Sequence, residues 1–223
     1  MFERFGPEKN MQLYDRGIRR RLAPMLGSRR EIELAHSLLF SLPGTPVLRY
    51  GDEIGMGDDL DLPEREAVRT PMQWSDAPSG GFSTASKLIH PIISEGVYGF
   101  EQVNVAKQKR DSQSMLSWMS RMIRLRKECP EIGWGEWEVL EMESRQVLVM
   151  RFTWLERSVL TIHNFDERPH DVTLKFPDLR LHNLLDDEDS APDSRGTHTL
   201  VIEAHGYRWY RFEQNATKRR TIR

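Results

Sequence analysis

The chain has 223 residues, of which 38% are hydrophobic, and its 32 Lys and Arg nearly balance its 34 Asp and Glu, for a net charge of -2. This composition suits one large or two small globular domains, and the charge gives no field that would attract nucleic acid or an anionic membrane. The single cysteine, Cys129, excludes an intrachain disulfide and is typical of a reducing cytoplasm.

The N-terminal residues 1–10 lack the apolar run of a signal peptide. No apolar stretch in the sequence approaches the ~20 residues that a membrane-spanning helix needs. We therefore expect a soluble, cytoplasmic protein that has neither nucleic acid nor membrane among its partners.

A helix, a turn and a strand are predicted in that order over residues 31–50. Apolar residues recur at spacings of three and four over 31–42, which predicts a helix with one buried face that ends at Pro43-Gly44. Residues 46–50 are too short for a helix and lie between Gly-containing turns, which predicts a strand entering a core. Helix, turn and strand in this order form one step of an α/β barrel.

A long irregular segment follows, over residues 58–105, with many prolines and glycines and little periodicity. Loops of this length in compact domains are usually functional, so we expect it to form one wall of a cleft. A second helix is predicted from about residue 112 to 128, because its apolar residues are periodic and its C-terminal end is basic.

The pattern changes near Gly133 to short segments in which apolar and polar residues alternate. Six strands are predicted, over residues 137–142, 147–154, 159–162, 172–176, 199–202 and 207–212. They predict a small antiparallel β-sandwich over 133–214, followed by a basic tail, 215–223, that we expect to be a frayed end. Four tryptophans in this region could form a sugar-binding surface, but core packing explains most of them better: Trp134, Trp137, Trp154 and Trp209.

Several strings in the first 130 residues resemble the α-amylase family of glycoside hydrolases (glycoside hydrolase family 13). Residues 42–53 resemble the segment around the family's eighth barrel strand, and Arg69-Thr-Pro-Met-Gln-Trp74 with Gly80-Gly-Phe-Ser83 resembles its α-glucosidase side. Residues 17–24, 98–105 and 114–119 are most similar to the trehalose synthases of the family, which isomerise maltose to trehalose.

The resemblance implies a fold class of α/β plus all-β. Residues 1–132 would be the C-terminal part of a TIM-type (β/α)8 barrel, and 133–214 the C-terminal β-sandwich domain. A complete barrel needs about 250 residues, roughly twice what lies before Gly133. The chain therefore resembles the last part of a longer enzyme.

The resemblance also implies that the family's catalytic residues lie outside this chain. Retaining enzymes use two carboxyl groups about 5 Å apart, one as nucleophile and one as acid/base. In the family these follow earlier barrel strands, as does a third Asp within an Asn-His-Asp string, and no such string occurs here. His163-Asn-Phe-Asp166 has another order and lies in the predicted sandwich. We expect no catalytic residue in the chain and no activity from it alone.

Arg69 is the predicted substrate-binding residue, because its string matches a position where the family places a glucose-pocket arginine. A planar guanidinium with five donors suits sugar hydroxyls and carboxylate pairing. The alternative is an exposed loop arginine. The family's partner for this arginine comes from an early barrel loop that has no counterpart here, so Arg69 is expected to lack that partner.

Four further residues are candidates for supporting roles. Glu53 follows the predicted strand and is expected to hold the loop or a neighbouring group by hydrogen bonds, and Tyr50 is expected to pack in the strand rather than form a sugar platform. Trp74 and Phe82 could stack on a sugar face or close the loop over its own small core.

No metal site or cofactor is predicted. Asp58, Asp59 and Asp61 lack the spacing of a calcium loop and are expected to form a solvated acidic turn. Cys129 has no histidine nearby in sequence and is not expected to be a nucleophile. The resemblance implies no organic cofactor.

Two classes of function remain open from the sequence. The first is a fragment of an enzyme of the trehalose synthase kind, or of an α-glucosidase or α-amylase-type hydrolase. Small α-glucosides such as maltose or trehalose would be its partners once the missing barrel half is supplied. The second is a non-catalytic carbohydrate-binding or interaction module.

Overall fold

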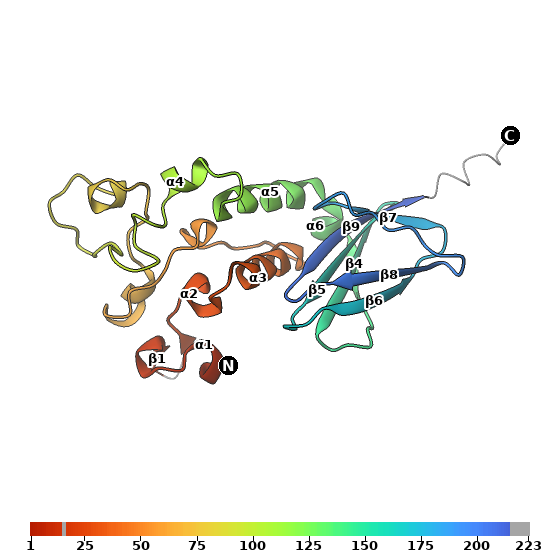
Figure 1. Cartoon of the computed structure of the whole chain (residues 1–223), viewed down its shortest axis with the longest axis horizontal. Helices are drawn as coiled ribbons and strands as arrows, with labels where there is room; N and C mark the ends of the chain where they lie inside the picture. Colours follow the sequence, from red (N-terminus) through yellow and green to blue (C-terminus); the bar gives the residue numbers. More distant parts are fainter. Residues whose placement is uncertain (15–16, 215–223) are drawn as a thin grey trace. The chain divides into compact units, whose positions relative to one another are not determined.

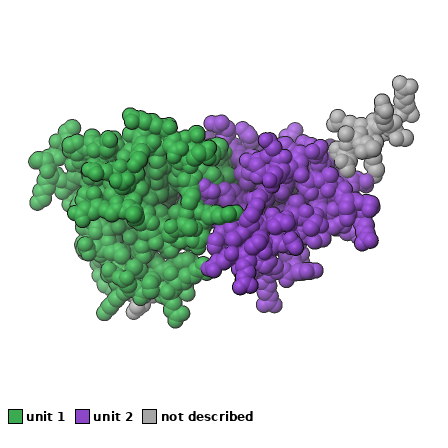
Figure 2. All heavy atoms as spheres, in the orientation of Figure 1, with its two compact units in different colours: residues 1–32, 47–122 green, residues 33–46, 123–223 purple. Residues whose placement is uncertain are grey.

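The computed structural model describes residues 1–14 and 17–214. The predicted basic tail, 215–223, lies outside the described residues. Figure 1 shows the order of the elements along the chain, and Figure 2 shows its two compact units. Unit 1 comprises Met1–Ile32 and Val47–Met122, and unit 2 comprises Glu33–Pro46 and Ile123–Arg223.

Unit 1 consists of short helices, a two-stranded hairpin and long connecting loops. Its elements are α1 (Phe2–Phe5), η1 (Lys9–Met11), β1 (Gln12–Leu13), β2 (Gly17–Ile18), α2 (Leu22–Leu26), η2 (Asp52–Ile54), η3 (Glu64–Val68), η4 (Pro78–Gly81) and α4 (Val105–Lys109). Helices α3 (Arg29–Ser41) and α5 (Met115–Glu128) each contribute residues to both units. The two helices predicted from apolar periodicity are thus confirmed, with ends that differ by at most three residues.

The strand predicted over residues 46–50 is wrong. The segment belongs to no ladder among the described residues, and Val47 and Tyr50 are 80% and 46% exposed. An extended segment becomes a strand only when a neighbouring strand supplies its hydrogen bonds. The described residues provide no such neighbour for this segment.

A small apolar cluster positions the loops of unit 1. It consists of Ile54, Met56, Met72 and Val105, with Val103 and Leu116 packed against it. The Gln108 side chain joins three elements around this cluster, because its amide donates to Ile54 O (2.8 Å) and its Oε1 accepts from Leu116 N (3.0 Å). The predicted irregular segment 58–105 is confirmed; it contains the short helices η3 and η4, and α4 begins at its last residue.

The turn at Gly51 requires glycine, and we expect alanine there to cost about 2 kcal/mol or more of folding free energy. The φ of Gly51 is +88°, and an added Cβ would lie 3.0 Å from Met56 Cγ and 3.1 Å from Arg21 Nη1. Gly96→Ala is the matched control, because Gly96 also has a positive φ, +70°, but no atom lies within 4 Å of its added Cβ. Urea unfolding of both variants measures the difference, and equal costs would contradict the close packing at Gly51.

Unit 2 contains two antiparallel sheets. Their strands are β3 (Glu136–Leu140), β4 (Val147–Trp154), β5 (Arg157–Asn164), β6 (His170–Lys175), β7 (Leu179–Asn183), β8 (Thr197–Ile202) and β9 (Tyr207–Gln214), preceded by α6 (Pro130–Trp134). The larger sheet has the order β3-β4-β5-β9-β7, and β6 pairs with β8 in the smaller one. Residues of both sheets share one apolar cluster, formed by Val147, Val149, Leu160, Ile162, Val172, Leu174, Leu181, Ile202 and Tyr210.

All six predicted strands are present, and β7 was missed. It is only five residues long and contains Arg, His and Asn rather than β-branched residues, although its burial alternates. Core packing is confirmed for Trp209, which is 0% exposed, but is wrong for Trp134 and Trp137, which are 79% and 53% exposed. β3 lies at one edge of its sheet, and most of its side chains are exposed on both faces.

The C-terminal half of α3 packs within unit 2 through polar contacts. Trp209 Nε1 donates to Ser37 Oγ (3.0 Å), and the same oxygen lies 3.0 Å from His163 Nε2. Tyr207 OH donates to Glu33 Oε2 at 3.1 Å. Among residues 1–14 and 17–214, every helix is too short or too polar to cross a membrane.

Candidate functional site

A cavity of about 860 Å³ in unit 1 is lined by all five residues that the sequence singled out. Its lining residues are Tyr50, Glu53, Arg69, Pro71, Met72, Trp74, Phe82, Ser83, Ala85, Lys87, Leu88, Ile89 and His90. They come from the turn at residues 50–53 and from the irregular segment that follows it. Most of the lining is apolar or aromatic, and charged groups from Arg69, Lys87 and Glu53 are set among it.

Arg69 follows η3 and reaches the cavity with its side chain 51% exposed. Its Nη1 lies 3.8 Å from Glu66 Oε1, and the other oxygen of Glu66 lies 3.3 Å from His90 Nε2. Arg69 therefore has a carboxylate partner within the chain, Glu66, in place of the early-loop partner that the chain lacks. At this exposure the ion pair contributes about 0–1 kcal/mol, so Arg69 remains available to a ligand.

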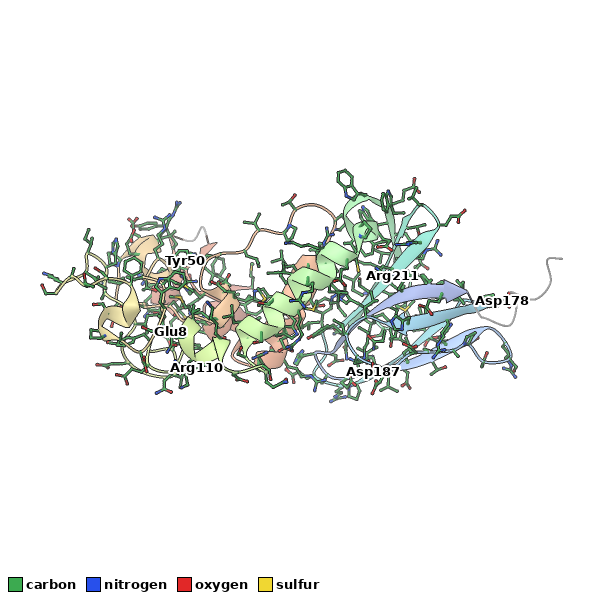
Figure 3. All side chains as sticks on the ribbon, turned by 90° about the horizontal axis from the view of Figure 1, so that it is seen from above. Glu8, Tyr50, Arg110, Asp178, Asp187 and Arg211 are labelled. Atoms are coloured by element: carbon green, nitrogen blue, oxygen red, sulfur yellow. The ribbon has the colours of Figure 1, made fainter. Side chains whose placement is uncertain are left out.

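Tyr50 and Glu53 belong to a tightly hydrogen-bonded turn. Tyr50, labelled in Figure 3, donates from its OH to Thr70 O (2.9 Å), and the residue is about half exposed. Gly51 N donates to Glu53 Oε2 at 2.6 Å. The Glu53 carboxylate thus ties its own turn together, which is the kind of contact that a loop-holding role requires.

Trp74 and Phe82 reach the same cavity because the chain reverses direction between them. Trp74 N and Ser75 N both donate to Gly80 O, at 2.8 and 3.0 Å. The two side chains are 49% and 50% exposed. Half-exposed aromatic rings beside polar groups present faces on which sugar rings can stack.

Three consecutive arginines, Arg19, Arg20 and Arg21, hold the segment from Tyr50 to Glu64 by hydrogen bonds, a role that the sequence did not indicate. Arg19 donates to Leu60 O (2.6 Å), Leu62 O (2.6 Å) and Glu64 O (2.9 Å). Its Nε also donates to Asn10 O. In the sequence these three residues form only a short run of cations, which is too short to form a charged helix face.

Asp58 is not part of a solvated acidic turn. Its side chain is 5% exposed and accepts from Arg20 Nε (2.8 Å) and Arg21 N (2.9 Å). A carboxylate can be buried to this extent because charged and backbone donors satisfy it. No group of three or more His, Cys, Asp or Glu that could hold a metal ion occurs in the described parts of the chain.

Cys129 lies buried in unit 2, and burial raises the pKa of its thiol to about 11. Arg211 Nη2 donates toward its Sγ at 3.4 Å. A thiol with so high a pKa stays protonated at neutral pH and is a poor nucleophile.

The lining of the cavity can bind a polyhydroxylated ligand but does not supply the chemistry of a glycosidase. Among the described lining residues Glu53 is the only carboxylic acid, whereas a retaining glycosidase needs two facing carboxyl groups. The His163-Asn-Phe-Asp166 string lies in and after β5, within unit 2, and His163 is fully buried.

Comparison with known protein families gives two matches. The alpha amylase catalytic domain model matches residues 17–135, and the sucrose hydrolase-like C-terminal domain model matches residues 157–211. The first match contains every residue that lines the cavity.

Individual relatives agree with this assignment. A trehalose synthase of Pimelobacter sp. is 37% identical over 92% of this chain and 38% of its own length. The trehalose synthase/amylase TreS of Mycolicibacterium smegmatis is 52% identical over 49% of this chain and 19% of its own. Among solved structures, an α-amylase from H. orenii superposes with a TM-score of 0.68 over 87% of this chain and 38% of its own, at 24% identity.

The chain spans well under half the length of these relatives. The catalytic-domain match covers more than half of the 223 residues and includes the strings that first indicated the family. The chain belongs to the α-amylase family of glycoside hydrolases.

Proposed function

We propose that this chain is the C-terminal part of a retaining enzyme of the trehalose synthase kind, acting on small α-glucosides such as maltose. Residues 1–132 would complete a (β/α)8 barrel begun by segments outside the chain, and 133–214 would form its β-sandwich domain. The names of the full-length relatives support the substrate class.

The observation that carries the proposal is the common cavity of the five candidate residues. Arg69 offers a fork of donors to sugar hydroxyls, and the rings of Trp74 and Phe82 offer stacking faces.

In the proposed mechanism this chain binds and encloses the sugar, while an Asp and a Glu outside it carry out bond cleavage. The Asp forms a covalent glucosyl intermediate, and the Glu protonates the leaving oxygen. Isomerisation follows if the retained glucose attacks the intermediate, and hydrolysis follows if water does. The loop that carries Arg69 and Trp74 would favour isomerisation by keeping water out.

Maltose binding and turnover test the proposal. The purified chain is expected to bind maltose weakly and to release neither glucose nor trehalose, because the catalytic carboxyl groups are supplied elsewhere. Two-dimensional NMR titration measures the binding, and separate assays for glucose and trehalose measure the turnover. Product from the pure chain would contradict the proposal that the catalytic carboxyl groups lie outside it.

Arg69→Ala is expected to weaken maltose binding by about tenfold, because a charged donor to sugar hydroxyls contributes roughly 1.5 kcal/mol. Arg65→Ala, a change of the same kind in η3 outside this cavity, is the matched control and should leave the affinity unchanged. Equal affinities of the wild type and Arg69→Ala would remove Arg69 from the sugar site.

Hydrolysis of α-glucosides is the second candidate, because one relative carries both the synthase and the amylase name. The ratio of trehalose to glucose formed by a complete enzyme decides between the two reactions. A chain that binds maltose but gains no activity when the missing barrel segments are supplied would instead be a non-catalytic carbohydrate-binding module.

A further inference from the structure

We infer that Arg21 is a positioning residue for the sugar site: its buried guanidinium holds the Tyr50 ring and the turn at residues 50–53 in the orientation that lines the cavity. This inference rests on the proposed function of that cavity. Arg21 itself does not line the cavity and is not expected to touch the sugar.

Arg21 contacts the turn in three ways. Its Nη1 donates to Tyr50 O (2.8 Å) and lies 3.4 Å from Asp52 Oδ1. Its guanidinium carbon lies 5.1 Å from the centroid of the Tyr50 ring, within the range of a cation–π interaction. One side chain therefore fixes the backbone, the ring and the neighbouring carboxylate together.

The rest of the turn is shaped around this guanidinium. Gly51 leaves room for it, since a Cβ there would approach Nη1 to 3.1 Å. Tyr50 OH is held from the other end by its hydrogen bond to Thr70 O. Thr70 O fixes the hydroxyl of Tyr50, and the Arg21 guanidinium lies over the face of its ring. These two contacts hold the ring in one orientation at the wall of the cavity.

The burial of Arg21 indicates that it does more than fill space. The residue is 2% exposed, and its Nε and Nη2 have no hydrogen-bond partner among the described residues. Burying a charged group with unsatisfied donors is unfavourable, and an apolar side chain of similar length would avoid that cost. The contacts that an apolar side chain could not make are those to Tyr50 and Asp52.

The test compares Arg21→Met and Arg21→Lys with the control Arg4→Met. Arg4 also lies over an aromatic ring of unit 1, at 5.4 Å from the Phe5 centroid, but is exposed and outside the cavity. Maltose affinity is measured by NMR titration. The Tyr50 ring resonances, assigned with Tyr50→Phe, report the ring orientation without any sugar.

We expect Arg21→Met to shift the Tyr50 ring resonances and to weaken maltose binding about tenfold, while Arg4→Met changes neither. Arg21→Lys should restore part of the affinity, since it keeps the charge but not the planar fork. Unchanged Tyr50 resonances in Arg21→Met would overturn the inference, as would loss of affinity without a change in the ring.

If the wild type binds no maltose, the proposed function fails, and the Tyr50 resonances alone decide whether Arg21 orients the ring. If Arg21→Met does not fold, the Tyr50 resonances are measured instead in Arg21→Ala, with and without added methylguanidinium. Recovery of the wild-type Tyr50 resonances on adding methylguanidinium supports the inference, and a folded protein without recovery overturns it.

Discussion

Replacing Arg211 by methionine is expected to lower the free energy of unfolding of unit 2 by about 3–5 kcal/mol. Arg211, labelled in Figure 3, belongs to β9, and its Nε lies 3.5 Å from Oε1 of Glu131 in α6. Glu131 is 0% exposed, and neither of its carboxylate oxygens has a hydrogen-bond donor in the described structure. Without Arg211 a buried carboxylate would lose the one cationic partner that it has among the described residues. Urea unfolding at pH 7, followed by the fluorescence of buried Trp209, measures the loss.

Two variants make this result specific. The double variant Arg211→Met with Glu131→Gln should recover most of the stability, because removing both charges leaves no uncompensated ion. Arg180→Met is the surface control, since Arg180 is 52% exposed and its ion pair with Asp189 should contribute about 0–1 kcal/mol. A loss below 1 kcal/mol in Arg211→Met would show that water or another group satisfies Glu131.

Acid is expected to destabilise unit 2 through His163. Burial lowers the pKa of this imidazole from 6.5 to about 3, and His163 is 0% exposed. Between pH 6.5 and 3 the unfolded chain therefore binds a proton that the folded chain does not. The free energy of unfolding of unit 2 is therefore not reduced by His163 above pH 6.5. It falls as the pH drops below 6.5, by at most about 1.4 kcal/mol per pH unit from this group.

The measurement is the free energy of unfolding at several pH values between 7 and 4. His163→Gln should unfold more easily at pH 7, because the contact with Ser37 is disturbed, but should lose part of the pH dependence. His90→Gln, a change at a side chain 45% exposed in unit 1, should keep the wild-type slope for unit 2. Equal slopes in His163→Gln and the wild type would mean that His163 titrates normally in the folded protein.

Local patterns predicted the elements that depend on local interactions. Helices α3 and α5 followed from apolar periodicity, and six strands followed from alternation. The segment at residues 46–50 has strand-like residues too, but its state depends on a partner strand that the sequence pattern does not contain. The exposure of Trp137 likewise depends on what packs against the faces of β3, which the residue pattern of the strand does not reveal.

The candidate site was predictable as a set of residues, because Arg69, Trp74 and Phe82 lie in rare strings close together in sequence. Its support was not predictable in this way. The contact between Arg21 and Tyr50 joins residues 29 positions apart, and that between Arg20 and Asp58 joins residues 38 apart. Such pairings depend on the path of the loop, and no residue spacing encodes that path.

The contact between Ser37 and Trp209 joins residues 172 positions apart within one compact unit. A ribosome that adds about 5–20 residues per second needs roughly 10–35 seconds to synthesise the chain between them. During that interval the C-terminal half of α3 has emerged, but the strand that covers Ser37 does not yet exist. Unit 2 is therefore expected to complete its folding only after β9 has left the ribosome, and the face of α3 that carries Ser37 is open to chaperones until then.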